Sequence, residues 1–398
     1  MFGSLITRGA APAVLAALMA APAAVALADA PPPSGASILS WTPAQQLYGY
    51  RNMEKIDPAR VIRRGAQVRP LPKAAAEIDP KWTWGGRDWD VASYMAAMRT
   101  SGVIVLKDGK IVLERYGLGR TPGERWTSFS VAKSVTSTLV GAAIQDGYIK
   151  SLDAPVTDYI RELKGSAYDG VTIRQLLTMT SGVKWNEDYS NPHSDVAQAG
   201  GAILEAGVNP IVSYMHRLPR ADPPGAKWVY KTGETDLAGI LVSNAVGKPL
   251  ADYLSEKIWA PYGMERDAVW VEDVAGHERG GCCISMTLRD YVRFGQFMLE
   301  GGKAGGRQVV PTGWVADATS EHVKLPPEEG VRGYGYFWWL PPGGYAAEGI
   351  FGQEVIVFPA DHVVIAINSA WLHADDDADW AAQAAFAEAL RAAAAKAR

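Results

Sequence analysis

Residues 126–135 read Trp-Thr-Ser-Phe-Ser-Val-Ala-Lys-Ser-Val and contain the tetrad Ser130-x-x-Lys133. The tetrad stands at the start of a helical pattern that runs from about Ser130 to Asp146, and Gly147 suits the position just after a helix. Residues three apart share a helix face, so the hydroxyl of Ser130 and the amine of Lys133 are predicted to lie together. The unpaired amides and positive end of such a helix also favour negative charge that develops at Ser130.

The same tetrad occurs again as Ser181-Gly-Val-Lys184. About one chance match is expected in a chain of this size, so context has to separate the two. Ser181 follows a helical pattern within Thr-Ser-Gly, where a serine is typical of a turn or a helix end. The context therefore predicts Ser130, and not Ser181, as a nucleophile.

A serine hydroxyl is a weak nucleophile until a base removes its proton. Lys133 can be that base only if desolvation or a second cation lowers the pKa of its amine. Otherwise it must act through another group, such as a tyrosine. The residues alone leave both routes open.

The flanking sequence predicts strands at both ends of the chain. Two β-rich runs, 101–106 and 111–116, are joined by Lys107-Asp108-Gly109-Lys110, and an Asp-Gly between two such runs indicates a hairpin. Further strands are predicted over 334–340, 345–350, 354–358 and 363–367, and the chain closes with a helix over 375–395. Because the residues between these strands have mostly helical spacing, we predict an α+β fold interrupted by a helical insertion.

The segment between about 150 and 300 carries the signals of several helices. Thr172 is a candidate cap for a helix over 173–179, and helical spacing continues over 235–246, 250–259 and 287–299. Residues 40–90, rich in Trp, Pro and Arg, have little periodicity and are predicted to form an extended arm.

Four segments in order resemble the serine β-lactamase and penicillin-binding superfamily, in its class C branch. In chain order they are 126–135, 171–182, Tyr230-Lys-Thr232-Gly and 280–290. The third of these resembles the Y-x-N or Y-x-S element of the family. The set is similar to that of the 6-aminohexanoate-dimer (nylon-oligomer) hydrolases and class C-like carboxylesterases, from about residue 45 to the C-terminus. This resemblance implies a β-lactamase/transpeptidase-like fold: an antiparallel sheet flanked by helices, a mostly helical domain, and an active-site cleft between them.

The implied domain boundaries follow from the same comparison. An N-terminal linker and arm covers 29–90, the α/β domain 91–133 and 300–398, and the mostly helical domain 134–299.

The resemblance also implies roles for individual residues. Ser130 would be the nucleophile, Lys133 its amine partner and Tyr230 the general base or proton shuttle. Thr232 stands where the family has Asn or Ser, and it is a candidate substrate contact. For Tyr230, the alternative is a core aromatic residue with a satisfied hydroxyl.

The third family element departs from the pattern. Relatives that open β-lactams carry K-T-G or H-T-G, whereas the matching segment here is Ala347-Glu-Gly349-Ile350, without Lys or His in its first position. The resemblance implies that the backbone N–H of Ile350 joins that of Ser130 in an oxyanion hole, which works whatever the side chain. Gly349 and Trp338, on or near this strand, are candidate substrate contacts. The missing cation argues against β-lactams as substrates.

An acidic and aromatic segment, 185–195, is predicted to be a loop at the cleft mouth. In nylon-oligomer hydrolases a similar loop meets the amino end of the substrate, which makes Glu187 and Asp188 candidate substrate contacts. A solvated loop is the alternative.

The N-terminus predicts an exported protein. Arg8 precedes the small, apolar stretch 10–27, and cleavage after Ala28 or Ala30 would satisfy a signal peptidase, so 1–28 is assigned as a signal peptide. An uncleaved membrane anchor is the alternative. After cleavage no membrane span is expected, and the periplasm or the medium is the expected location.

Composition and missing motifs exclude other classes. With 398 residues, 48% hydrophobic and 21% charged, the chain is typical of globular proteins, and its formal charge of −4 without a long basic run argues against nucleic-acid binding. The six histidines never lie three to five residues apart, and no phosphate loop or dinucleotide fingerprint occurs, so no metal or cofactor is expected. Cys282 and Cys283 are adjacent, and two thiols are the expected state because a disulfide between neighbours is strained.

We therefore expect a serine hydrolase that cleaves an ester or a linear amide, such as an aminohexanoate-type oligomer, through an acyl-enzyme on Ser130. The alternatives are a D,D-peptidase or β-lactamase that acts on peptidoglycan-like substrates, and a non-catalytic binding protein of the same fold.

Overall fold

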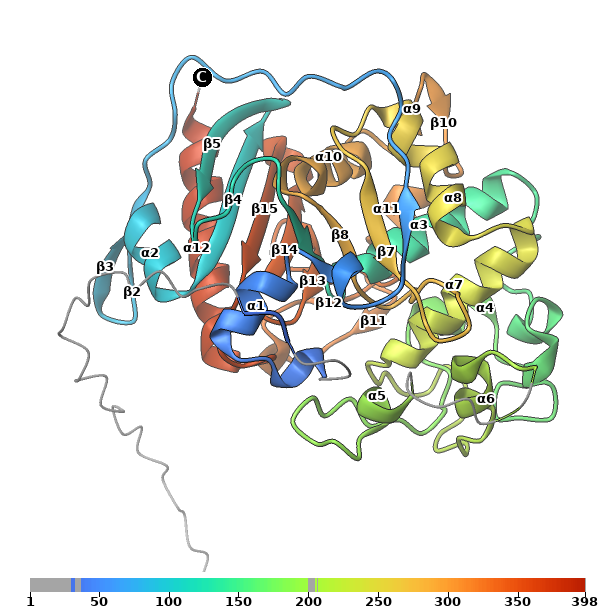
Figure 1. Ribbon diagram of the computed structural model, residues 1–398. Coiled ribbons are helices and arrows are strands. Elements are labelled where there is room, and N and C mark those ends of the chain that lie inside the picture. Colours follow the sequence, from blue (N-terminus) through green and yellow to red (C-terminus); the bar gives the residue numbers. More distant parts are fainter. Residues whose placement is uncertain (1–29, 33–36, 200–204, 206, 398) are drawn as a thin grey trace, which may run out of the picture.

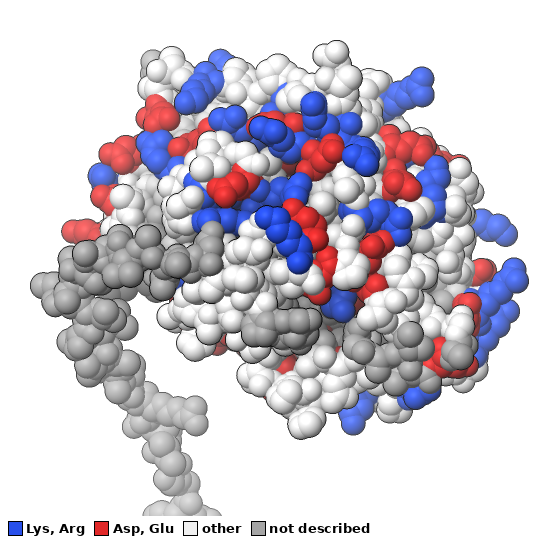
Figure 2. Space-filling view, in the orientation of Figure 1, with Lys and Arg blue, Asp and Glu red and all other residues white. Residues whose placement is uncertain are grey.

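The computed structural model describes residues 30–32, 37–199, 205 and 207–397. The predicted signal peptide, residues 1–28, lies outside them. Within the described part of the chain, every helix is too short or too polar to cross a bilayer. On the face drawn in Figure 2, acidic and basic side chains are interspersed, and neither sign dominates.

The main sheet has five antiparallel strands in the order β13-β14-β15-β4-β5. Their bounds are β4 (Thr100–Lys107), β5 (Lys110–Tyr116), β13 (Tyr345–Gly349), β14 (Gln353–Phe358) and β15 (Val363–Ser369). The β4–β15 pairing joins the strands from the first third of the chain to those near its C-terminus, as the sequence predicts. The β4–β5 turn contains Asp108 at φ 50° and Gly109 at φ 74°, the left-handed pair that closes a tight hairpin.

Helices cover both faces of this sheet (Figure 1). One face packs against α2 (Val91–Ala97) and α12 (Asp377–Lys396), the other against α10 (Leu288–Leu299). Alternation along the strands explains this, because successive side chains point to opposite faces. On β4, Val103 and Val105 join the cluster around Phe386 of α12, whereas Ile104 and Leu106 join the larger core around α10.

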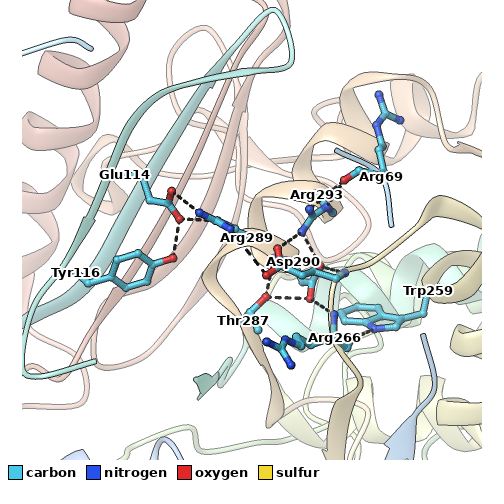
Figure 3. A network of polar contacts seen from close by, with 10 residues as sticks. Arg69, Glu114, Tyr116, Trp259, Arg266, Thr287, Arg289, Asp290 and Arg293 are labelled. Carbon is cyan, nitrogen blue, oxygen red and sulfur yellow. Dashed lines mark hydrogen bonds and ion pairs between the residues drawn. The ribbon is translucent and has the colours of Figure 1, made fainter. Parts of the chain in front are cut away.

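A polar network fixes α10 to its surroundings (Figure 3). Thr287 caps the helix by accepting the N–H of Asp290, and the Asp290 carboxylate accepts from Arg293 at 3.1 Å. Arg289 donates two hydrogen bonds, at 2.7 and 2.9 Å, to Glu114 on the edge strand β5. Although α10 lies in the segment predicted as the mostly helical domain, it packs against the five-stranded sheet.

A second, four-stranded sheet has the order β1-β7-β8-β6. Its strands are β1 (Ala59–Ile62), β6 (Arg125–Thr127), β7 (Ala268–Val271) and β8 (Ile284–Thr287). The predicted extended arm therefore contributes a strand, and it also holds α1 (Pro43–Gly49) and a hairpin of β2 (Lys81–Trp84) and β3 (Arg87–Asp90). Strands of three or four residues are too short to show a clear alternation in sequence.

The helical part packs around α3 (Val131–Gln145), which is buried from Val131 to Ala143. α7 (Thr232–Val246) lies against α3 and against α4 (Ile173–Leu177), and α4 is capped by Thr172 as predicted. The remaining helices and strands are α5 (Asp195–Gln198), α6 (Pro210–His216), α8 (Leu250–Leu254), α9 (Ala260–Tyr262), α11 (Trp314–Ala318), β9 (Lys303–Ala304), β10 (Arg307–Gln308), β11 (Val323–Lys324) and β12 (Gly333–Tyr334). The predicted 250–259 helix continues beyond α8 as a π-helical turn over Ser255–Trp259.

Two local predictions are wrong. The strand predicted over 334–340 is reduced to β12, because Phe337 at φ 59° turns the backbone into the left-handed region. Cys282 and Cys283 are joined in a disulfide, whereas two thiols were expected. Cys283 has φ 72°, and this turn replaces the extended backbone that would point neighbouring side chains to opposite sides.

Candidate active site

Ser130 lies at the head of α3, and two residues, Ser128 and the left-handed Phe129, separate it from the end of β6. Phe129 has φ 43°, a costly conformation for a non-glycine residue, and its ring is held against Tyr50 at 5.1 Å and Phe351 at 5.2 Å. Ser130 is the N-cap residue of α3, yet its side chain accepts no capping hydrogen bond. The hydroxyl is therefore not occupied by the backbone of the helix and is left for contacts with side chains.

Lys133 lies one turn further along α3 and is 2% exposed. Its Nζ donates to Ser130 Oγ at 2.9 Å, to Thr232 Oγ1 at 2.9 Å and to the carbonyl oxygen of Gly281 at 2.8 Å. Burial lowers the pKa of Lys133 to about 8, although the nearby carboxylates of Glu187 and Asp236 favour its charged form. The amine can therefore lose its proton close to neutral pH.

Tyr230 precedes α7, and its phenol lies close enough to the hydroxyl of Ser130 for that hydroxyl to lower its pKa. The Nζ of Lys133 lies 5.2 Å from the centre of the Tyr230 ring, and the ring stacks on Trp339 with centres 5.6 Å apart. Burial, and then the charge of Glu187, raises the pKa of Tyr230 well above its usual value. Tyr230 therefore holds its phenolic proton far more firmly than Lys133 holds its ammonium proton.

Thr232 and Glu187 form the third side of the site. Thr232 is the first residue of α7, and its hydroxyl accepts from Lys133 and donates to Glu187. Its backbone N–H also donates to the Glu187 carboxylate, at 2.9 Å. A carboxylate at the start of a helix is favoured by the helix dipole, so Glu187 anchors the loop 185–195 to α7.

Asp236 and Gly281 were not predicted as site residues. Asp236 Oδ1 accepts the N–H of Gly281 at 2.8 Å, and the Gly281 carbonyl is one of the acceptors of Lys133. A side chain at Gly281 would lie 2.9 Å from the methyl group of Thr232, so this approach requires glycine. Asp236 follows Thr232 by four residues on α7, a spacing that places both on one helix face and was the available signal.

The end of β13 lies against the head of α3. A side chain at Gly349 would meet the carbonyl oxygen of Ser128 at 2.6 Å and the amide nitrogen of Ser130 at 2.9 Å. The backbone of Gly349, the residue before Ile350, therefore lies beside the amide of Ser130. Two backbone N–H groups on adjacent segments are the arrangement that an oxyanion hole needs.

The structure brings some predicted residues together and separates others. Ser130, Lys133, Tyr230, Thr232 and Glu187 are in one contact network. Asp188 is exposed, and its carboxylate accepts from the N–H and hydroxyl of Ser190 within the loop.

The tryptophan beside the site is Trp339 and not Trp338. Trp338 is 0% exposed and packs in the core against Phe294 and Tyr345, whereas Trp339 stacks on Tyr230. Adjacent residues point to opposite sides of the chain, so only one of the two can reach the site.

The residues of the second tetrad, Ser181 and Lys184, do not form a serine–lysine pair in the described structure. Ser181 is buried and donates to Glu234, while Lys184 is exposed. The helix α4 ends at Leu177, so the two residues are not on a common helical turn.

Sequence comparisons show the family to which the chain belongs. The sequence model of the family described as "Beta-lactamase" matches residues 90–388. The chain is 32% identical over 288 residues to the 6-aminohexanoate-dimer hydrolase of Paenarthrobacter ureafaciens, covering 68% of this chain and 73% of that protein. It is 28% identical over 207 residues to Esterase EstB of Burkholderia gladioli, covering 50% and 52%.

A solved structure has the same fold. A Bacillus anthracis protein described as a candidate 6-aminohexanoate-dimer hydrolase superposes with a TM-score of 0.77 at 23% identity, covering 88% of this chain and 95% of that one. At this identity the likeness shows the fold alone. The predicted α+β fold and the resemblance found in the motifs are both confirmed.

Proposed function

The chain belongs to the β-lactamase family of serine hydrolases, and from the contacts of its site we propose that it cleaves an ester or a linear amide through an acyl-enzyme on Ser130. One observation carries the proposal. The buried amine of Lys133, with its pKa lowered to about 8, lies 2.9 Å from the hydroxyl of Ser130.

In the acylation step, Ser130 Oγ attacks the substrate carbonyl carbon while its proton passes to the neutral amine of Lys133. Lys133 is the better acceptor because its pKa is lowered, whereas that of Tyr230 is raised. These pKa directions support Lys133 as the base in the choice that the residues alone leave open. The carbonyl oxygen becomes an oxyanion, and the N–H groups of Ser130 and Ile350 are its proposed donors.

Collapse of the tetrahedral intermediate then breaks the bond to the leaving group. Tyr230 lies beside Ser130, and its ring centre is 5.2 Å from Nζ of Lys133, so its phenol can give a proton to the leaving oxygen or nitrogen and recover one from the Lys133 ammonium. Water attacks the ester of Ser130 by the reverse route and releases the acid.

The proposed substrate order is activated esters first, linear amides second and β-lactams last. Alkoxides need less protonation than amines when they leave. A β-lactam carboxylate would meet Ala347 where a lysine or histidine would pair with it, and Lys231, next to Tyr230 in sequence, is buried against Glu234. Loss of one charge-assisted hydrogen bond costs roughly 1.5–3 kcal/mol, or about one to two decades in rate.

The test compares kcat/KM on one preparation for p-nitrophenyl butyrate, an aminohexanoate dimer and a chromogenic cephalosporin. Turnover of the ester that disappears in Ser130→Ala, and that exceeds turnover of the cephalosporin by at least about tenfold, supports the proposal. Equal values, or a preference for the cephalosporin, would restore the β-lactamase alternative.

A further inference from the structure

Glu187 is surrounded by hydrogen-bond donors. One oxygen accepts the N–H of Thr232 at 2.9 Å and the indole N–H of Trp185, and the other accepts the hydroxyls of Tyr189, at 2.8 Å, and of Thr232. A carboxylate offers about four acceptor positions, so these donors occupy its full capacity. An ionised carboxylate donates nothing, so all four bonds have a fixed direction.

The direction of the Thr232 hydroxyl follows from this. A hydroxyl has one hydrogen, and the Thr232 hydrogen is committed to Glu187. The oxygen of Thr232 can then only accept from Lys133, which lies 2.9 Å away.

The orientation of the neutral Lys133 amine follows in turn. A neutral amine has two hydrogens and one electron pair. The carbonyl of Gly281, at 2.8 Å, is an acceptor only, and Thr232 is constrained to be one. Both hydrogens therefore point to these two groups, and the electron pair is left for the third neighbour, Ser130.

We propose that Glu187 is a positioning residue that fixes the direction of the hydrogen bonds from Lys133 to Thr232, so that the neutral amine presents its electron pair to the hydroxyl of Ser130. The proposal rests on the proposed function, because it concerns the step in which Ser130 loses its proton. It also replaces the substrate contact predicted for Glu187, whose acceptor positions are filled by the protein itself.

Glutamine at this position would reverse the chain of bonds. Its amide NH₂ cannot face the N–H groups of Thr232 and Trp185, because neither accepts, so it must face the two hydroxyls. The Thr232 hydroxyl would then accept from the amide and turn its hydrogen toward Lys133. The neutral amine of Lys133 would then accept this hydrogen, so its electron pair would point to Thr232 and away from Ser130.

A purely electrostatic role for Glu187 predicts the opposite outcome. The charged groups that act on Lys133 are Glu187 and Asp236, and both raise its pKa, while the ring of Tyr230 lies over it. Removing the charge of Glu187 would therefore lower the pKa of Lys133 and leave more neutral amine at pH 7. By charge alone Glu187→Gln would be as active as the native protein or faster.

The experiment measures kcat and KM for p-nitrophenyl butyrate at pH 7.5 or so in the native protein, Glu187→Gln, Thr232→Val and the double variant. We expect Glu187→Gln to lower kcat about 100-fold with KM within about threefold, since general-base catalysis contributes on the order of 10²–10⁴. Thr232→Val removes the hydroxyl through which Glu187 acts, so the double variant should match Thr232→Val within about twofold and exceed Glu187→Gln.

Asp195→Asn is the matched control. Its carboxylate belongs to the same loop and accepts from the N–H of Asn186 at 2.7 Å and the hydroxyl of Tyr214 at 2.6 Å, without touching Thr232. We expect kcat within about twofold of the native value, which would separate loosening of the loop from loss of the bond direction.

Three outcomes would overturn the inference: a Glu187→Gln protein with undiminished kcat, a loss confined to KM, or losses that multiply in the double variant. The rate of labelling of Ser130 by a fluorophosphonate is measured on the same four proteins. It should follow the same pattern, and it keeps this test separate from the proposed substrate. A native protein that labels normally but cleaves no ester would contradict the proposed function and leave the positioning role open to measurement.

Discussion

Two opposing effects set the pKa of Lys133. Burial favours the neutral amine and sets the pKa at about 8, while Glu187 and Asp236 favour the ammonium. Its three acceptors satisfy the ammonium fully, so the charged form is stable in the resting site. The balance keeps the pKa of Lys133, the proposed base, close to the pH at which it would act.

This balance predicts a pH profile. Because the neutral amine is the proposed active form, kcat/KM for an ester should rise with pH and level off above a midpoint near 8. Asp236→Asn removes a charge that raises the pKa of Lys133, while its amide oxygen can still accept from Gly281. The midpoint should therefore move down by about half a unit. Stopped-flow acylation rates across pH 5–10 measure it, and a midpoint that stays or rises would contradict this role for Lys133.

At the residue scale, sequence reasoning identified the groups that share a motif. Ser130 and Lys133 are three apart on one helix, and the resemblance supplied Tyr230. Thr232 and Glu187 were predicted as substrate contacts, but their hydrogen bonds to Lys133 and to each other could not be derived, and neither could the contact of Lys133 with Gly281. They come from three separate segments, and their directions depend on which atom donates in each hydrogen bond.

Among the strands and helices, β13 matters to the site because its end lies against the start of α3. The segment 345–350 was predicted as a strand, and its missing cation was visible in the sequence. The approach of Gly349 to the backbone of Ser128 and Ser130 was not, because it depends on how two distant segments pack.

Gly349→Ala should therefore damage catalysis more than stability. The added methyl group would meet backbone atoms at 2.6 and 2.9 Å, so β13 would have to move away from the amide of Ser130. We expect kcat/KM to fall at least about 30-fold, since one oxyanion-hole donor is worth on the order of 10²–10³. Gly123→Ala is the control, because its methyl group would make only an ordinary contact with Arg266 at 3.7 Å. Equal activity of the two variants would show that β13 does not contribute a donor.

Of the two larger sheets in the described chain, the five-stranded one was predicted from the sequence and the four-stranded one was not. Strands 100–116 and 345–369 form one sheet, as long apolar runs at both ends of the chain indicated. The sheet β1-β7-β8-β6 was not predicted, although its strand β6 leads into the segment 126–135 that contains Ser130. Its short strands are defined by pairing and not by local pattern.

Global stability should depend on a buried acidic pair in the main sheet. Glu348 and Glu354 face each other across β13 and β14, and burial raises the pKa of both, that of Glu354 from 4.5 to about 7. A raised folded pKa gives stability that is present below pH 4.5 and lost as the pH rises through about 7. The native protein should therefore lose stability between pH 5 and 8.

Glu354→Gln removes this titration and keeps an acceptor for Gln383. The loss of unfolding free energy between pH 5 and 8 should shrink by about 2 kcal/mol, since one pKa unit is worth about 1.4 kcal/mol. Urea titrations at the two pH values measure the difference. Parallel pH dependence in the native protein and the variant would show that Glu354 is ionised at no cost in the folded state.

The assignment of Ser130 as the nucleophile is tested most directly by the position at which a covalent probe modifies the chain. A fluorophosphonate probe should add one phosphonyl group per chain, and peptide mapping should find it on Ser130. Labelling should persist in Ser181→Ala and vanish in Ser130→Ala. An adduct on Ser181, or labelling that survives the loss of the Ser130 hydroxyl, would contradict the assignment of Ser130 as the nucleophile and with it the proposed mechanism.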